Sequence, residues 1–88
     1  MSLRLPKNFN KKFQFSQDGK SLTISDLEDI LNKNPSILRG VLDKRVCLHG
    51  SPFHIIQWFI LLYGYADQIF ISNIKLTDEE AELLIKNY

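Results

Sequence analysis

The stretch that decides the fold is residues 45–72, RVCLHGSPFHIIQWFILLYGYADQIFIS. Apolar segments of strand length at residues 45–49 and 67–72 each predict a β-strand. Between them, Ser51 followed by proline predicts a helix start, because serine caps the first amides and proline lacks only an amide that would be unpaired there. The apolar pattern extends this helix over residues 52–66. A strand, a crossover helix and a strand predict a right-handed unit with two parallel strands.

This stretch also raises the question of a membrane segment, since 21 uncharged residues separate Arg45 from Asp67 and about 20 suffice to cross a bilayer. Glycine, serine and proline at residues 50–52 interrupt the run, and two histidines and a glutamine in it would have to be desolvated in lipid. We therefore expect a buried core helix and no membrane partner. A single cysteine, Cys47, and the lack of an apolar run in residues 1–10 predict a cytoplasmic protein with no internal disulfide and no signal peptide.

Upstream of this unit, residues 12–24 predict a β-hairpin. Apolar residues alternate with polar ones on both sides of Asp18-Gly19, a dipeptide that favours a type I′ turn because both central residues need positive φ. The residues expected on the inward face of the hairpin are Phe13, Phe15, Leu22 and Ile24.

Capping signals and breakers place the next helices. Ser25 and Glu28 form a capping-box pattern ahead of a helix over residues 26–33, which the following Asn-Pro pair should end. Residues 36–42 are expected to be irregular, with a short helix over residues 35–39, because the glycine in this segment weakens a helix.

The chain ends on a further amphipathic helix. Thr77 and Glu80 form a second capping box ahead of it. The residues of its apolar stripe follow at helical spacing and are Ala81, Leu84, Ile85 and Tyr88.

Together these elements predict one small α/β domain over residues 12–88, preceded by a basic flexible N-terminus, residues 1–11. The expected order is β-β-α-β-α-β-α, with a mixed four-stranded sheet and helices mainly on one face. The apolar block at residues 69–71 is typical of a strand covered on both faces. Because a chain of 88 residues buries only about 60–65% of its unfolded surface, self-association is a common remedy for its small core.

The balance of charge argues against a general attraction to nucleic acid or to an anionic membrane. The chain has eleven Lys and Arg and ten Asp and Glu, although the charged residues among the first twelve are all basic and four acids, Asp78, Glu79, Glu80 and Glu82, crowd the last fifteen. No aromatic and basic interleaving continues into the body of the chain, so the basic start fits a solvated arm better than a nucleic-acid arm. Nucleic acid is therefore kept only as an alternative partner.

The turn between the first parallel strand and the central helix is the best candidate for a ligand site, because open α/β sheets bind ligands where a strand ends and a helix begins. Amides at the helix start would hold an anionic group, and the candidate binding residues are Gly50, Ser51, Phe53, His54 and Gln57. His49 and His54 are weak candidates for a general base, since histidine titrates near neutrality. This interpretation predicts a small anion-, nucleotide- or RNA-binding domain, with hydrolysis as a further option.

A purely structural interpretation of the same turn is simpler, and we favour it. Ser51 caps the helix, His49 ends the strand and His54 lies on a polar stripe. Cys47, in the middle of a strand, is expected to be inert packing, and with two histidines it lacks a fourth ligand for a metal. The chain also lacks a glycine-rich phosphate loop. We therefore expect no metal and no cofactor, and we lean away from an enzyme.

The central helix has more apolar surface than one small sheet can cover. Such a helix buries about 100–180° of its circumference, whereas this one is apolar over roughly 240°. The face expected to point toward the sheet holds Ile55, Ile56, Phe59, Leu62, Tyr63 and Ala66. The residues expected on the uncovered flank are Trp58, Ile60 and Tyr65, to be covered by other helices or by a second subunit. We therefore predict a non-enzymatic protein-interaction or regulatory domain that forms a homodimer, or docks on another protein, through this flank.

Overall fold

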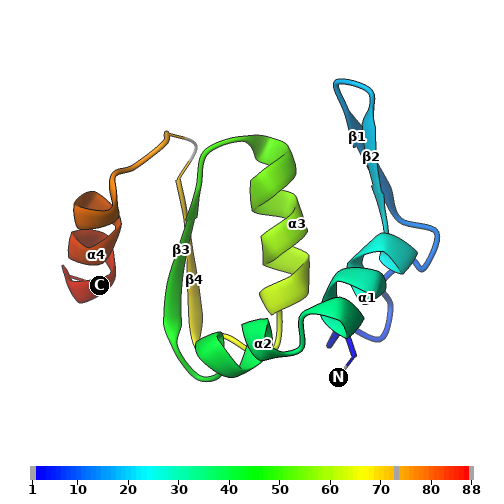
Figure 1. Ribbon diagram of the computed structural model, residues 1–88, viewed down its shortest axis with the longest axis horizontal. Helices are drawn as coiled ribbons and strands as arrows, with labels where there is room; N and C mark the ends of the chain where they lie inside the picture. The colour runs from blue at the N-terminus through cyan, green and yellow to red at the C-terminus, as the bar shows by residue number, and fades with distance from the viewer. Residues whose placement is uncertain (1, 73, 88) are drawn as a thin grey trace.

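The computed structural model describes residues 2–72 and 74–87 and has the mixed helices and strands of a small α/β domain, as predicted (Figure 1). Its elements in chain order are β1 (Gln14–Gln17), β2 (Lys20–Thr23), α1 (Ile24–Lys33), α2 (Ser36–Val41), β3 (Arg45–His49), α3 (Pro52–Leu62), β4 (Gln68–Ser72) and α4 (Asp78–Asn87). The strand β3 has the predicted bounds. The helix α2 occupies a segment for which the sequence predicts mostly irregular structure.

The unit formed by β3, α3 and β4 is the centre of the molecule. Its strands are parallel, with Val46 opposite Ile69 and Leu48 opposite Ile71, as the strand–helix–strand order predicts. The helix α3 lies on one face of this sheet and α4 on the other (Figure 1). The helices α1 and α2 lie on the same side as α3, so the helices are mainly on one face, as predicted, and α4 is the exception. Successive side chains of β3 point to opposite faces of the sheet, which explains why each face is covered by a helix. Buried Leu48 belongs to the core on the α3 face, whereas His49 points the opposite way and bonds the segment before α4.

The hairpin forms a sheet of its own. Within the described residues, β1 pairs only with β2 and β3 only with β4, so the predicted four-stranded sheet is wrong. The reason is the wide apolar circumference of α3, which β3 covers on one side while β1 and α1 pack on another (Figure 1). The hairpin thus serves as a second cover for the helix rather than an extension of the sheet. Its predicted turn is confirmed, because Asp18 and Gly19 have φ angles of 51° and 77°.

The start of α1 shows how one cap can displace another. Thr23 is the N-cap, since its Oγ1 accepts from Asp26 N (3.2 Å) and its own amide donates to Asp26 Oδ2 (2.9 Å). The predicted capping box of Ser25 and Glu28 is therefore wrong, and the helix begins at Ile24. Thr23 has the advantage that it ends β2, so one residue closes the strand and opens the helix.

The end of α3 also differs from the prediction. The helix ends at Leu62 rather than at residue 66, because Gly64 takes a φ of 80° that breaks the helical path. The backbone then turns into β4, where Asp67 N donates to Lys44 O at the start of the parallel pair (2.8 Å). A shorter helix leaves Tyr65 free to turn inward, and it becomes a buried core residue.

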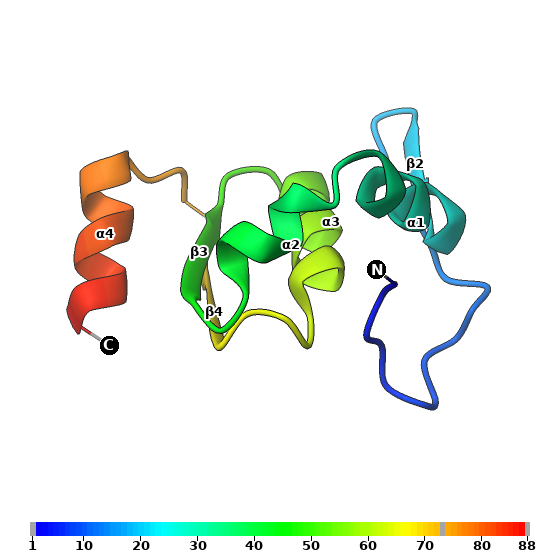
Figure 2. The ribbon, with the colours of Figure 1, turned by 60° about the horizontal axis from the view of Figure 1, so that its bottom comes forward.

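The first residues of the chain pack against this turn. Arg4 Nη1 donates to Gly64 O (3.0 Å), and the guanidinium lies 4.1 Å from the centre of the Tyr65 ring. The Tyr65 hydroxyl donates to the Ser2 carbonyl, while Leu3 and Leu5 pack on the core. The beginning of the chain accordingly lies beside α3 and α1 (Figure 2). Residues 2–5 of the expected basic arm are thus held against the domain by specific contacts.

One core cluster joins the elements on both sides of α3. Its members are Leu22, Leu27, Leu31, Leu38, Leu48, Ile60, Leu61, Leu62 and Tyr65. They come from β2, α1, α2, β3 and α3 and from the turn after α3, so the hairpin and the parallel sheet share a core. Among the described residues, no helix has both the length and the apolar content needed to cross a membrane.

Candidate functional site

The turn between β3 and α3 has the local structure that its residues predict. Gly50 takes a φ of 107°, which favours glycine, and Ser51 follows as the N-cap of α3. Ser51 Oγ accepts from His54 N (3.3 Å), and Pro52 occupies the first turn of the helix. The serine side chain therefore uses one of the two amides that an anion would need.

The second amide is used by the hairpin. Phe53 N donates to Gln17 Oε1 of β1 (3.1 Å), a contact between residues 36 positions apart, and the Phe53 ring lies 6.0 Å from that of Phe15. An anionic ligand would have to displace both Gln17 and Ser51. Gln57, the last of the predicted binding residues, lies half-buried one turn further along α3. The turn is built as a joint between the sheet, the helix and the hairpin.

His49 has a structural contact of its own. Its Nδ1 accepts from Leu76 N (3.0 Å), which fixes the connection between β4 and α4. Only a ring with an unprotonated Nδ1 can accept this bond. Immediately after it, Thr77 N donates to Glu80 Oε1 (3.0 Å) and Glu80 N donates to Thr77 Oγ1 (3.2 Å), which confirms the predicted capping box. Hydrogen bonding to the backbone and side chain of Thr77 lowers the pKa of Glu80.

Replacing His49 by leucine should therefore weaken the docking of α4. The Leu76 amide would lose its acceptor in a half-buried position, at a cost of about 1 kcal/mol in the free energy of unfolding. Urea denaturation would measure this cost, and hydrogen exchange at Leu76 should become faster. The control is His54→Leu, because the exposed His54 ring has only a loose contact, 6.2 Å between centroids, with Trp58. Equal losses in the two variants would contradict this role for His49.

The remaining candidates for chemistry are a reactive thiol at Cys47 and a metal site. Cys47 is a half-buried free thiol in β3, and burial raises its pKa, which disfavours the reactive thiolate. In residues 2–72 and 74–87, no three His, Cys, Asp or Glu side chains are grouped so that they could hold a metal ion. The candidate residues thus have structural partners or lack the grouping that metal chemistry needs.

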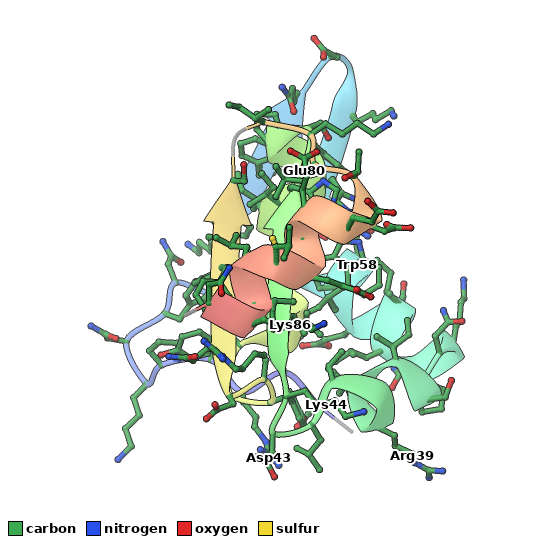
Figure 3. The ribbon with its side chains drawn as sticks, turned by 90° about the vertical axis from the view of Figure 1, so that its left-hand side faces the viewer. Arg39, Asp43, Lys44, Trp58, Glu80 and Lys86 are labelled. Carbon is green, nitrogen blue, oxygen red and sulfur yellow. The ribbon has the colours of Figure 1, made fainter. Side chains whose placement is uncertain are left out.

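The predicted interface residues lie in different places from those expected. Ile60 and Tyr65 are only 7% and 5% exposed and belong to the core, so the domain itself covers them. Trp58 is half-buried, also packs on the core, and lies on the side of the domain away from β4 (Figure 3). The apolar surface that remains uncovered on α3 belongs to two residues assigned to the core, Phe59 and Tyr63.

Phe59 and Tyr63 lie close together around the end of α3, on a different side of the helix from Trp58. At about 100° per residue they follow Trp58 by roughly 100° and 140° around the helix. The side of α3 that contains Phe53 is covered by the hairpin, because the Phe53 ring packs on Phe15 of β1. The rings of Phe59 and Tyr63 lie 6.2 Å apart and form one exposed aromatic stripe. This stripe borders the same sheet face as Ile71, the exposed end of the row in which Leu48 is buried.

A second apolar area borders β4 on the opposite face. It surrounds a groove lined by Ile71, Ser72, Leu76, Glu80, Leu83, Leu84 and Asn87. The exposed hydrophobic side chains on both faces together form a surface that we call the β4 flank: Phe59 (37% exposed), Tyr63 (39%), Ile71 (54%), Ile74 (68%) and Leu83 (58%). The strand β4 is thus bordered by exposed apolar residues on either side, unlike the strand covered on both faces that its sequence predicts.

The exposure of one residue of this surface, Leu83, could have been predicted from the sequence. Leu83 is apolar but falls outside the stripe of α4 formed by Ala81, Leu84 and Ile85, so a leucine there has no place in the expected core. Ile71 had no such signal, because a strand of three consecutive apolar residues does not indicate which face is covered.

Comparison with known proteins gives no relative on which to base an assignment. No family model, no curated protein and no solved structure matches the chain. What the fold and the surface define is a class of protein: a small α/β domain with exposed apolar side chains on both sides of an edge strand. Its function therefore has to be inferred from that surface.

Proposed function

We propose that this chain is a non-enzymatic protein-interaction domain and that the β4 flank is its contact surface. The observation that carries this proposal is the grouping of exposed hydrophobic residues. Of the six large exposed ones among the described residues, all but Leu42 belong to the β4 flank. Hydrophobic residues scattered singly over a surface need no explanation, whereas a contiguous group marks a site of association.

The other candidate surface supports an interaction role rather than ligand chemistry. At the start of α3, the amides of Phe53 and His54 already have protein acceptors, and His49 bonds the segment before α4. These contacts stabilise the fold and leave the turn without a free donor pair for an anion. The β4 flank, in contrast, has side chains without cover, including two aromatic rings of the kind enriched at interfaces.

Self-association is the form of interaction that we expect, with regulation through assembly as its use. Small domains bury a limited fraction of their surface and commonly gain stability from a second copy. The flank of α3 takes part, as the apolar excess of this helix predicts, but through Phe59 and Tyr63 instead of Trp58, Ile60 and Tyr65.

Sedimentation velocity over a dilution series tests this proposal. We expect the weight-average mass to rise with concentration from 10.3 kDa toward twice that value. The double variant Phe59→Ser/Tyr63→Ser should need at least tenfold more protein to reach the same mass, because it removes two aromatic anchors from the contact. The matched control is Leu42→Ser, which changes an exposed hydrophobic residue outside the flank. A wild-type chain that remains monomeric up to millimolar concentration would overturn the proposal.

A further inference from the structure

We infer that β4 pairs with β4 of a second copy in antiparallel orientation, so that two domains share one four-stranded sheet. This inference rests on the proposed function and specifies its partner and geometry. Within the described residues, β3 is the one strand that pairs with β4. Parallel sheets are normally larger and covered on both faces, and a two-stranded sheet is marginal on its own.

The strand β4 is a better candidate for pairing than β3. Across the parallel pair, Leu48 of β3 is 8% exposed whereas the opposite residue of β4, Ile71, is 54% exposed. Charged residues, proline and glycine bulges protect an edge strand from pairing with another strand. The sequence of β4, QIFIS, has none of these residues. In contrast, β3 begins with Arg45 directly after Asp43-Lys44. Charged residues that disfavour pairing therefore lie at the start of β3, whose residues are already half-buried or buried.

A two-fold axis perpendicular to the sheet, through the middle of β4, gives a self-complementary register. It places Ile69 opposite Ile71 of the second copy, and Gln68 opposite Ser72 of the second copy. The two isoleucines lie on the α3 face, so each exposed Ile71 gains a β-branched neighbour across the new pair. This axis keeps both α3 helices on one face of the joint sheet and both α4 helices on the other.

The same arrangement brings three further residues of the β4 flank toward the second copy. In the order β3, β4, β4, β3, the outer strands lie about 14 Å apart, three strand spacings of roughly 4.8 Å. Helices in direct contact lie about 8–10 Å apart, so large side chains must fill the space between equivalent helices. The exposed large side chains available for this are Phe59 and Tyr63 on the α3 face and Leu83 on the α4 face.

The two-fold axis also sets the relative direction of the two α4 helices. The first turn of α4 contains Asp78, Glu79 and Glu80, and its last turn contains Lys86. The helix crosses β3 diagonally, and its last turn lies nearer β4 than its first turn does (Figure 3). The axis makes the two α4 helices, and therefore their dipoles, antiparallel.

The area available is sufficient for a specific but moderate contact. Aromatic side chains bury on the order of 150–250 Å² each, and the Ile and Leu side chains of the β4 flank are somewhat smaller but more exposed. The five residues together leave roughly 500 Å² per copy, or about 1,000 Å² in a pair, which is near the lower limit for a specific interface. We therefore expect dissociation in the micromolar range.

Disulfide trapping tests the register directly, in a Cys47→Ser background. The variant Gln68→Cys/Ser72→Cys should form a covalent dimer under mild oxidation, because opposite residues of an antiparallel pair lie within disulfide reach. The two cysteines of one chain are too far apart along the strand to bond each other. Each single variant, Gln68→Cys or Ser72→Cys, is the matched control and should remain uncoupled, since its cysteine would face a residue without sulfur. Trapping by a single variant, or none by the double variant, would overturn the register.

A second measurement keeps the inference testable without cysteines. Amide exchange in residues 68–72 of the wild-type chain should slow at least tenfold between low micromolar and high micromolar concentration. Ile71→Lys should abolish this dependence and weaken dimerisation at least tenfold, whereas Leu42→Lys should leave both unchanged. A dimer whose β4 amides exchange equally fast at all concentrations would overturn strand pairing and leave the proposed function standing. A chain that remains monomeric at all concentrations would overturn both.

Discussion

Replacing Leu61 by alanine should lower the free energy of unfolding by about 3 kcal/mol. Leu61 is fully buried in α3, the helix that packs between the parallel sheet and the hairpin. Loss of its isopropyl group removes buried apolar contacts and leaves a cavity that neighbours on two sides can fill only in part. Because small domains have only about 5–15 kcal/mol of total stability, this change is a large share of the whole. Urea denaturation followed by Trp58 fluorescence would measure it.

The matched control is Leu42→Ala, since Leu42 is the same residue type at 45% exposure. That variant should shift the free energy of unfolding by less than about 0.5 kcal/mol. Both measurements belong at low micromolar concentration, where the expected dimer is dissociated. If the two variants lost similar amounts, Leu61 would not have the central position that its burial indicates.

The parts of the fold that the sequence predicts correctly depend on short-range signals. Val46 and Leu48 alternate with polar or smaller residues, Ser51 and Pro52 open a helix, and the Asp18-Gly19 pair needs positive φ at both positions. Each signal lies within a few residues of the structure it produces. That is why β3, the start of α3 and the hairpin turn have the predicted places.

The orientation of α3 could not be predicted in the same way. A helix that is apolar around most of its circumference has no preferred face, so its own sequence does not indicate which side meets the sheet. The elements that pack on it decide, and they bury Ile60 and expose Phe59. The separation of the two sheets has the same origin, because strand pairing between distant segments has no local signal.

The candidate ligand site shows the corresponding limit for function. The cap by Ser51 is local and was predictable from its spacing to His54. The contact between Gln17 and the Phe53 amide, in contrast, joins residues of the hairpin and α3 that approach only in the folded chain. A sequence can therefore indicate that a helix start has free amides, but only the tertiary structure reveals which of them the protein itself uses.

Gly64→Ala should destabilise the domain by about 2 kcal/mol, for two physical reasons that act together. The φ angle of Gly64 is 80°, a region that residues with a Cβ rarely adopt. A Cβ built there would also lie 2.7 Å from Arg4 Cβ and 3.3 Å from the Arg4 carbonyl oxygen, so the N-terminal segment would have to move away. We expect a lower urea midpoint together with faster amide exchange in residues 2–5.

Gly40→Ala is the matched control, and it should have the opposite sign. Gly40 lies inside α2, where a new Cβ meets no atom within 4 Å, so alanine should stabilise the helix by about 0.5–1 kcal/mol. Adding Arg4→Gly to Gly64→Ala separates the two causes, because it removes the Cβ contact and leaves the strained φ. The combined loss should then be smaller than the sum of the two single losses. Simple additivity would mean that the contact with Arg4 plays no part and that backbone strain alone makes glycine necessary at this turn.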